Sequence, residues 1–300
     1  MKQVVKIVHN PKAGTGDFHK KKVTDVIERM GMIYEYISTE EEDWENFLRT
    51  KTDMVFLAGG DGTICRLARI LLKNQVSASS IPIILIPAGT ANNIAKTLGI
   101  PKRSEPSIKL EGNDINFDCG RVLGLPDHDY FLESFGVGLF PQLMLETKNR
   151  DIQKDSPSEE MKLARKLLLK ISVAYKAKQA EVITDGTSFK GSFLLIEIMN
   201  IQFIGPNLKL APHADPSDGY LEVVMLREED RGDFVAYLGK SINGESENNG
   251  ADRFLKTLRA KKIKVVWDGK TAHVDDRVIE DYPRTGCTVE MSDQGLEFMT

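Results

Sequence analysis

The feature that most constrains the fold is a glycine-rich loop at residues 59–63, Gly-Gly-Asp-Gly-Thr. Residues 54–58 before it are apolar, as in a strand buried on both faces, and residues 64–72 after it have the pattern of a helix. Glycines lack a Cβ atom and let the backbone approach a phosphate, and the start of the helix offers unpaired N–H groups. The segment therefore predicts a strand–loop–helix unit that binds an anion. An ordinary tight turn has the same composition and stays an alternative.

Asp61 adds a charge to this loop. Its carboxylate lies among the glycines and would repel a phosphate on its own. A divalent cation between the carboxylate and the ligand removes that repulsion, and Mg²⁺ prefers oxygen ligands of this kind. The loop and the carboxylate together indicate a nucleotide that is bound with Mg²⁺.

Two further loops follow predicted strands, one after residues 4–9 and one after residues 81–87. Both contain glycine together with amide or hydroxyl side chains, and the first contains a lysine that could neutralise a phosphate. In a parallel sheet, all strands that lead into helices end at the same edge, where ligands collect. Polar residues at a helix start also serve as ordinary caps, so each loop alone is a weak signal. Three such loops on one edge predict a nucleotide site.

The order of the predicted elements divides the chain near residue 120. Before it, apolar strands at residues 4–9, 32–37, 54–58 and 81–87 alternate with helices, which is typical of a mostly parallel α/β sheet. After it, β-rich runs predict an antiparallel β-sandwich. These runs lie at residues 130–135, 180–184, 191–198, 220–226, 260–267 and 272–279. The predicted fold class is an N-terminal mostly parallel α/β nucleotide-binding domain at residues 1–120, followed by an antiparallel β-sandwich domain at residues 121–289.

An amphipathic helix is predicted at residues 160–178, because Lys162, Lys166 and Lys170 recur at four-residue spacing beside apolar residues. A solvated helix face explains these lysines. A surface that meets anionic membranes is the alternative. Polar residues at 151–160 and 243–252 predict exposed loops.

The composition narrows the classes of function. A formal net charge of -4 disfavours binding to nucleic acid, and no apolar stretch is long enough to cross a bilayer. The amino terminus lacks the pattern of a signal peptide. Cys65, Cys119 and Cys287 are odd in number and have no zinc-finger spacing, so they indicate a reducing compartment and no thiolate metal site. We therefore expect a cytoplasmic protein without nucleic-acid partners.

Three loop motifs carry a resemblance to a known family. They are Asn10-Pro11-x-Ala13-Gly14, Gly59-Gly60-Asp61-Gly62-Thr63 and Pro87-Ala88-Gly89-Thr90-Ala91-Asn92. Together they resemble the diacylglycerol kinase catalytic-domain family, which includes soluble bacterial lipid kinases and the sphingosine kinases and is related more remotely to NAD kinases. Residues 117–122, 135–138 and 203–223 resemble later motifs of the family. The resemblance therefore spans nearly the whole chain.

The resemblance implies an ATP-dependent lipid kinase that works with Mg²⁺ and transfers the γ-phosphate to a lipid hydroxyl such as that of diacylglycerol. It also implies peripheral association with a membrane surface, where the lipid substrate lies. Residues 290–300 are expected to return to the first domain. A homodimer is possible as the oligomeric state. The candidate catalytic residues are Asp275 and Asp61, and the candidate metal ligands are Asp61, Asp118 and Asp218. The candidate nucleotide-binding residues are Asn10, Lys12, Gly14, Thr39, Gly59, Gly60, Asp61, Gly62, Thr63, Gly89, Thr90 and Asn92.

Two positions depart from the family's pattern. Where the family has an aspartate-glycine-glutamate element that supplies the catalytic base, this chain has Asp275-Asp276-Arg277, and arginine cannot act as a base near neutral pH. Either Asp275 or nearby Glu280 takes the role, or activity is weak or altered. Where the soluble bacterial lipid kinases usually carry an aspartate in a magnesium and water network, this chain has Asn93. These two departures make a catalytically weak nucleotide-binding regulatory protein one alternative, and an NAD kinase-like enzyme is the closest rival among enzymes.

Overall fold

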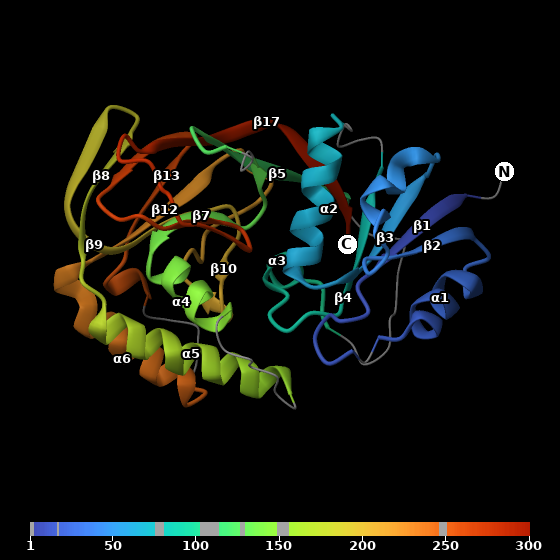
Figure 1. Ribbon diagram of the computed structural model, residues 1–300, viewed down its shortest axis with the longest axis horizontal. Coiled ribbons are helices and arrows are strands. Elements are labelled where there is room, and N and C mark those ends of the chain that lie inside the picture. Colours follow the sequence, from blue (N-terminus) through green and yellow to red (C-terminus); the bar gives the residue numbers. More distant parts are fainter. Residues whose placement is uncertain are drawn as a thin grey trace. The chain divides into compact units, whose positions relative to one another are not determined.

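The computed structural model describes residues 3–16, 18–75, 81–102, 114–126, 130–148, 156–245 and 251–300. The chain forms two compact units. Unit 1 consists of residues 1–118 and 293–300, and unit 2 consists of residues 119–292. The sequence places these boundaries at residues 120 and 290. In chain order, unit 2 is therefore inserted between two parts of unit 1, as the colours along the ribbon in Figure 1 show.

The sheet of unit 1 is parallel, as the alternation of strands and helices predicts. Its strands lie in the order β2-β1-β3-β4, and the end of β17 (Cys287–Met299) pairs in parallel with β4, with Phe298 opposite Ile83. Because these strands run in one direction, the loops that follow β1 to β4 lie at one edge of the sheet. The elements are β1 (Val4–His9), α1 (Lys20–Arg29), β2 (Ile33–Ser38), the 3₁₀ helix η1 (Trp44–Arg49), β3 (Met54–Gly59), α2 (Asp61–Lys73), β4 (Ile83–Pro87) and α3 (Asn93–Thr97).

Buried aliphatic side chains on both faces make β1, β3 and β4 the centre of this sheet. Ile7, Phe56 and Ile84 pack in one cluster with Val23 and Ile27 of α1. Side chains alternate along a strand, so the intervening buried residues face the other side of the sheet. Every residue of β3 and β4 is buried, a pattern that is typical of parallel strands with both faces covered.

Helix α2 begins at Asp61, three residues before the predicted start at Ile64. Gly60 is its N-cap and has an extended backbone. An acidic first residue is favourable here because the N-terminus of a helix carries partial positive charge. Asp61 and Gly62 therefore lie in the first turn of the helix and not in the preceding loop.

Unit 2 consists mainly of antiparallel strands. β15 pairs with β7, β7 with β9, β9 with β8, and β8 with β14, while β12 lies between β9 and β13. Two strands, β5 (Asp114–Leu123) and β17 (Cys287–Met299), have residues in both units. The other elements are β6 (Tyr130–Phe131), β7 (Ser134–Gly138), α4 (Leu139–Lys148), α5 (Pro157–Ala174), β8 (Lys178–Thr184), β9 (Thr187–Met199), β10 (Phe203–Ile204), β11 (Leu208–Lys209), β12 (Leu221–Arg227), η3 (Glu228–Asp230), α6 (Arg231–Ile242), η4 (Ala251–Arg253), β13 (Lys256–Ala260), β14 (Lys262–Trp267), β15 (Ala272–Val274) and β16 (Arg277–Ile279).

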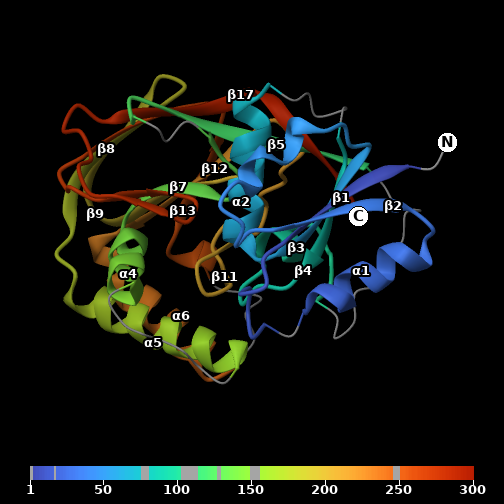
Figure 2. The same ribbon diagram turned by 45° about the vertical axis from the view of Figure 1, so that its right-hand side comes forward.

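Strand β12 contributes to two separate cores of unit 2, because its side chains alternate between two faces. Val223 and Met225 belong to the cluster inside the sandwich, whereas Val224 and Leu226 pack with residues of α4, α5 and α6. Helices α5 and α6 lie side by side in both ribbon views (Figures 1 and 2). The predicted fold class, a parallel α/β part followed by an antiparallel sandwich, is confirmed. Of the helices in the described ranges, none combines the length and the apolar character needed to cross a bilayer.

The bounds of several predicted segments in unit 2 are wrong. The helix predicted at residues 160–178 covers Pro157–Ala174, because the side chain of Ser156 caps it by accepting the N–H of Glu159 at 3.3 Å. Residues 157–160 are thus helical and not part of a loop, while 151–155 and 246–250 of the two predicted loops lie outside the described residues. The run predicted at 272–279 is a pair of strands joined by a turn at Asp275, and the run at 130–135 is interrupted at Leu132 and Glu133.

Candidate nucleotide site and candidate catalytic carboxylates

Three predicted nucleotide loops follow β1, β3 and β4 of unit 1, and they touch one another. A Cβ atom built on Gly89 would lie 2.5 Å from the Cα atom of Gly60, so the second and third loops meet backbone to backbone. Gly14 has a positive φ of 60°, and a Cβ atom there would collide with the carbonyl oxygen of Ala88. These glycines therefore allow a close approach that no other residue type would permit.

Replacing Gly89 with alanine is expected to lower both stability and ATP affinity, because the new methyl group has no room against Gly60. Overpacking of this kind costs about 1–3 kcal/mol. Thermal unfolding and calorimetric titration of ATP measure the two effects. Gly232→Ala in α6 is the matched control, since a Cβ atom at Gly232 meets nothing within 4 Å. An unchanged melting temperature and ATP affinity in Gly89→Ala would contradict the close packing of the loops.

Side-chain hydrogen bonds also join the three loops. The amide nitrogen of Asn10 donates to the hydroxyl of Thr63 at 3.0 Å. Asn92, which has a positive φ of 51°, accepts the N–H of Gly89 at 2.9 Å and donates to the carbonyl oxygen of Gly89 at 2.8 Å. After β2, the N–H of Thr39 donates to the carbonyl oxygen of His9 at 2.9 Å. The predicted residues of all four loops thus lie at the same edge of the sheet.

Asp61 contacts the start of α3. Its carboxylate accepts the backbone N–H of Asn93 at 2.9 Å and that of Ile94 at 3.0 Å. Burial raises the pKa of Asp61, and the N–H groups of Ile94 and Asn93 oppose that increase. The residue therefore has a structural partner that the sequence does not reveal, in addition to its predicted role.

The donor atoms around Asp61 suit a hard cation. The Asp61 carboxylate and the buried amide oxygen of Asn93 are oxygen ligands of the kind that Mg²⁺ prefers. A second carboxylate of unit 1, Asp118, lies half-buried in β5. The residues present in unit 1 are thus compatible with Mg²⁺, and the assignment of Asp61 and Asp118 as ligands stays a prediction.

The remaining predicted residues are less informative. Lys12 is exposed and forms an ion pair with Glu40 at 2.9 Å. Gly59 ends β3, and Thr90 lies partly exposed between Gly89 and Asn92. Their binding roles stay predictions.

Asp218, in unit 2, lies in a turn before β12. Its carboxylate accepts the N–H of Tyr220 at 2.9 Å and pairs with the guanidinium of Arg259. Arg259 already supplies positive charge beside this carboxylate. A structural Mg²⁺ at Asp218 stays a prediction.

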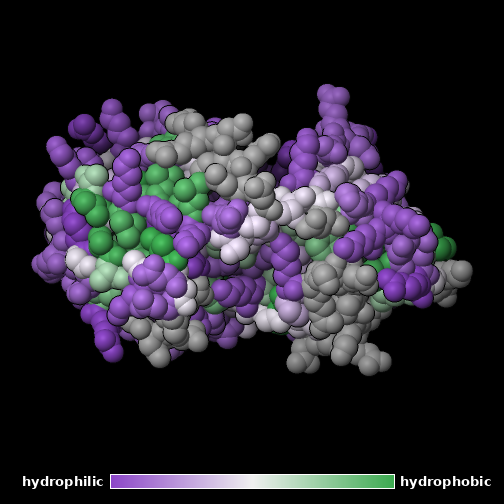
Figure 3. All heavy atoms as spheres, turned by 90° about the horizontal axis from the view of Figure 1, so that it is seen from below, coloured by the Kyte–Doolittle hydropathy of each residue, from purple (hydrophilic) through white to green (hydrophobic). Residues whose placement is uncertain are grey.

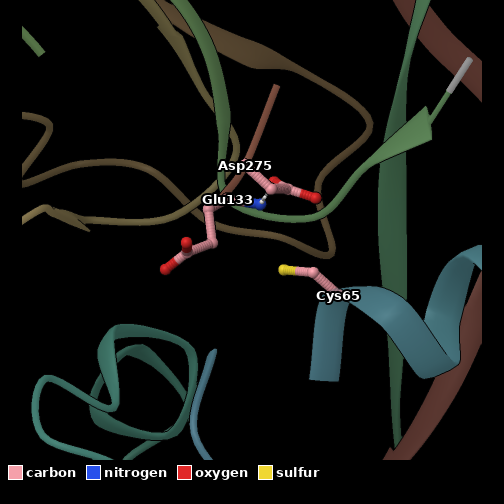
Figure 4. A group of neighbouring side chains, drawn as sticks. All are labelled: Cys65, Glu133 and Asp275. Carbon is pink, nitrogen blue, oxygen red and sulfur yellow. Dashed lines mark hydrogen bonds between the residues drawn. The ribbon is translucent and has the colours of Figure 1, made fainter. Parts of the chain in front are cut away.

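In unit 2, Asp275 occupies the turn between β15 and β16 with a positive φ of 51°. Its carboxylate accepts three backbone N–H groups, from Leu132 at 3.1 Å, Glu133 at 2.8 Å and Ser134 at 3.4 Å. Figure 4 shows the bond from the N–H of Glu133 to the Asp275 carboxylate. Asp275 therefore joins two distant segments of unit 2, and its role as the general base stays a prediction.

Glu133 is a neighbour that the sequence-based reasoning missed. A carboxylate oxygen of Glu133 lies within 4.8 Å of one of Asp275. No motif marks the position, because residues 130–140 resemble an ordinary apolar strand apart from this one acidic residue. The single acidic residue, Glu133, was the signal in the sequence that could have marked this position, since charged residues are rare in apolar strands.

A buried ion pair lies on the strands next to the Asp275 turn. His273 Nε2 is 2.9 Å from the carboxylate of Glu197, and His273 Nδ1 is 3.0 Å from the carbonyl oxygen of Asp275. Gly136 lies between the two on β7, where a Cβ atom would collide with the Glu197 carboxylate. Burial lowers the pKa of His273, but the charge and hydrogen bond of Glu197 outweigh it and raise the pKa above its usual value. The same burial raises the pKa of Glu197.

A pocket of about 830 Å³ in unit 2 lies between α4, α5 and the segment around β16. Met144, Leu145 and Ala164 give it an apolar part, and Lys148, Arg277 and Glu280 give it charges of both signs. Arg277, which stands where the resemblance expects the catalytic glutamate, thus lines this pocket. The mixture suits a ligand with both apolar and polar parts.

Comparisons with known proteins agree with these observations. The diacylglycerol kinase catalytic domain model matches residues 4–122, and the YegS C-terminal NAD kinase beta sandwich-like domain model matches residues 156–295. A diacylglycerol kinase from Bacillus subtilis (strain 168) is 26% identical over 281 residues, covering 87% of this chain and 84% of that protein. A diacylglycerol kinase from Mycobacterium tuberculosis (strain H37Rv) is 25% identical over 228 residues, covering 75% of this chain and 70% of that protein.

Comparison with solved structures also finds similar folds. A crystal structure of a diacylglycerol kinase from Bacillus anthracis strain Sterne has a TM-score of 0.70 at 18% identity, covering 99% of this chain and 96% of that chain. Another crystal structure of a protein from that strain has a TM-score of 0.76 to this chain at 21% identity, covering 99% of this chain and 96% of that chain. The two family models together cover most of both units, in the order in which the family has them. The chain belongs to the diacylglycerol kinase catalytic-domain family.

Proposed function

We propose that the protein is an ATP-dependent lipid kinase that transfers the γ-phosphate to a lipid hydroxyl such as that of diacylglycerol. The observation that carries the proposal is the edge of unit 1 where the glycine loops after β1, β3 and β4 touch each other beside Asp61. This edge combines glycine loops and the N-terminus of helix α2 with a carboxylate, and it lies within the match to the kinase catalytic domain. The two relatives named above are diacylglycerol kinases by name.

The chain's own residues have distinct parts in this reaction. Gly14, Gly60 and Gly89 let the three nucleotide loops pack against one another, and Asp61 with Asn93 would hold Mg²⁺. When bound, Mg²⁺ neutralises the charge that develops on the transferred phosphoryl group. Carboxylates near the β15–β16 turn accept the proton of the attacking hydroxyl. The half-apolar pocket beside Arg277 in unit 2 suits the acceptor lipid.

Incubation of the purified protein with labelled ATP, Mg²⁺ and a panel of lipids in mixed micelles tests the proposal. We expect label in a phosphorylated lipid, with diacylglycerol among the acceptors. NAD in a parallel reaction tests the NAD kinase alternative, and label in NADP alone would establish it. ATP binding without any labelled product would favour the regulatory protein, a possibility that Asn93 and Arg277 keep open.

We further propose that the exposed side of α5 contacts anionic membranes. Lys162, Lys166 and Lys170 are all exposed on this helix, and Val173 beside them is 59% exposed. Figure 3 shows the side of the molecule on which α5 and α6 lie, where hydrophilic side chains surround a hydrophobic area. Basic side chains next to an exposed apolar one are typical of surfaces that meet a lipid interface.

Replacing Lys162, Lys166 and Lys170 with glutamine is expected to weaken binding to anionic vesicles, by about 1 kcal/mol for each lysine that lies near the surface. The loss is expected to be greatest at low salt, because ions screen surface charges. Sedimentation with vesicles of anionic and of neutral lipid measures it. The matched control replaces three exposed lysines elsewhere in unit 2, Lys256, Lys262 and Lys264. Equal loss in both triple variants would show that only net charge matters.

A further inference from the structure

We infer that the guanidinium of Arg259 takes the place of the metal ion that the resemblance predicts at Asp218. The turn before β12 is then held by a cation of the chain itself, and Mg²⁺ has no part in the stability of this turn. The inference concerns unit 2 alone and stands whether or not the protein is a lipid kinase. It is supported by the hydrogen bonds within the turn, the contacts of Arg259 and the positive charges near Tyr220.

Hydrogen bonds within the turn engage two of its carboxylates. The carboxylate of Asp215 accepts the N–H of Ser217 at 3.0 Å and the hydroxyl of Ser217 at 2.6 Å. The Oδ1 atom of Asp218 accepts the N–H of Tyr220 at 2.9 Å. The backbone N–H of Asp218 donates to the carbonyl oxygen of Asp215 at 3.4 Å. These bonds fix the direction of the Asp218 carboxylate and leave its Oδ2 atom as the oxygen that meets a cation.

The cation beside that oxygen belongs to Arg259, on β13. The Nη2 atom of its guanidinium pairs with Oδ2 of Asp218, and the Nε atom of the same group lies 3.5 Å from Oε1 of Glu222. Glu222 is directly opposite Arg259 in the pairing of β12 with β13. A guanidinium stays protonated in proteins and presents several N–H donors in one plane, so it can bridge two carboxylates as a divalent cation would.

The burial of Glu222 makes a positive charge necessary at this place. Glu222 is only 7% exposed, and a carboxylate that is removed from water is costly unless a cation lies beside it. Asp218 brings a second negative charge to the same guanidinium. Arg259 therefore compensates two carboxylates at once, which is the electrostatic role expected of a structural Mg²⁺.

The ring of Tyr220 holds the guanidinium and brings a second cation to the turn. The central carbon of the Arg259 guanidinium lies 4.5 Å from the centroid of that ring, and the ammonium nitrogen of Lys261 lies 4.8 Å from the same centroid. Cations at such distances are attracted to the face of an aromatic ring. A Mg²⁺ ion at Asp218 would therefore approach two positive charges, and like charges repel most strongly at short range.

The atoms around Asp218 do not fit Mg²⁺ while Arg259 is in place. Mg²⁺ requires oxygen ligands in near-octahedral order at about 2.0–2.1 Å. A guanidinium offers N–H donors and no acceptor atom, so it cannot be one of these ligands. It also occupies the side of Oδ2 from which an ion would bind. An ion could bind at this turn only after the guanidinium moves away.

Melting temperatures in EDTA and in excess Mg²⁺ test the inference, together with calorimetric titration of Mg²⁺. The unchanged protein and Asp218→Asn should show the same Mg²⁺-dependent shift and bind the same number of ions, because any ion in unit 1 is common to both. Arg259→Ala should melt about 2–4 °C lower in EDTA. Mg²⁺ should recover part of that loss, because two uncompensated carboxylates attract a cation, and the recovery should vanish in Arg259→Ala/Asp218→Asn.

Lys262→Ala is the matched control. Lys262 on β14 forms an exposed ion pair with Glu290 at 3.0 Å, and such pairs contribute little to stability. Its loss in EDTA should therefore be smaller than that of Arg259→Ala, and equal losses would overturn the inference. Arg259→Lys should restore part of the stability, because it returns a positive charge. A stabilisation by Mg²⁺ that the unchanged protein shows and Asp218→Asn lacks would also overturn the inference and assign a metal ion to Asp218.

Discussion

Asp61→Asn is expected to lower turnover by at least about 100-fold and to weaken the binding of ATP in the presence of Mg²⁺. An asparagine keeps the size of the side chain but removes the charge that would hold the cation, and a metal ion contributes several kcal/mol to such a reaction. A 100-fold loss corresponds to about 2.7 kcal/mol. Turnover with labelled ATP and calorimetric titration of ATP measure the two effects.

Asp61→Ala separates this role from the contact with α3. Alanine leaves the N–H groups of Asn93 and Ile94 without the carboxylate that they contact, at a cost of about 1–3 kcal/mol for each buried donor. We therefore expect a lower melting temperature in Asp61→Ala than in Asp61→Asn. Asp53→Asn is the control, because Asp53 precedes β3 at the opposite edge of the sheet and also accepts a backbone N–H, from Val4 at 2.9 Å. Normal ATP affinity together with normal turnover in Asp61→Asn would exclude the metal role.

Glu197→Ala is expected to destabilise the protein by about 3–5 kcal/mol, the usual cost of removing one partner of a buried ion pair. Glu197 is fully buried and His273 nearly so, and His273 in turn contacts the carbonyl oxygen of Asp275. The turn at Asp275, whose carboxylate accepts the N–H of Glu133, should therefore lose stability as well. Thermal or urea unfolding measures the stability, and Glu197→Gln, which keeps the size and a hydrogen bond, should cost much less.

The same pair predicts a pH dependence of stability. The pKa of His273 is raised in the folded protein, so its contribution is fully present below the ordinary value of 6.5 and is lost as pH rises through the folded value. The raised pKa of Glu197 acts in the same direction, because the folded pair retains a proton that the unfolded chain has released. Melting temperature should thus fall as pH rises above 6.5, and Glu197→Gln should flatten that decline. If melting temperature falls equally with pH in the unchanged protein and in Glu197→Gln, this prediction is contradicted.

Much of unit 1 could be predicted from the sequence, because its signals are local. β3 and β4 are short apolar runs, and glycine after each marks a turn whichever residues lie nearby. The parallel arrangement then brings the loops to one edge without further information. What the local signals could not reveal is the contact of Asp61 with α3, which sets the first turn of α2 against a helix that begins 32 residues later.

In unit 2 the decisive contacts join residues far apart in the chain. The turn at Asp275 depends on hydrogen bonds from residues 141 to 143 positions earlier, and no pattern within residues 272–279 shows them. Glu133 was missed for the same reason, since Asp275, which accepts its N–H, lies in a turn 142 residues later. The resemblance predicts Asp218 as a metal ligand and does not reveal its pairing with Arg259, which spans 41 residues.

The insertion of unit 2 into unit 1 affects how the chain is made. β4 pairs on one side with β3 and on the other with residues 298 and 299 of β17, which are synthesised only after all of unit 2. Until then the second side of β4 is an open strand edge, and such edges invite pairing with other chains. Ribosome-bound intermediates that end within unit 2 are therefore the stage at which this protein is most exposed to aggregation, and a chaperone that covers strand edges would act there.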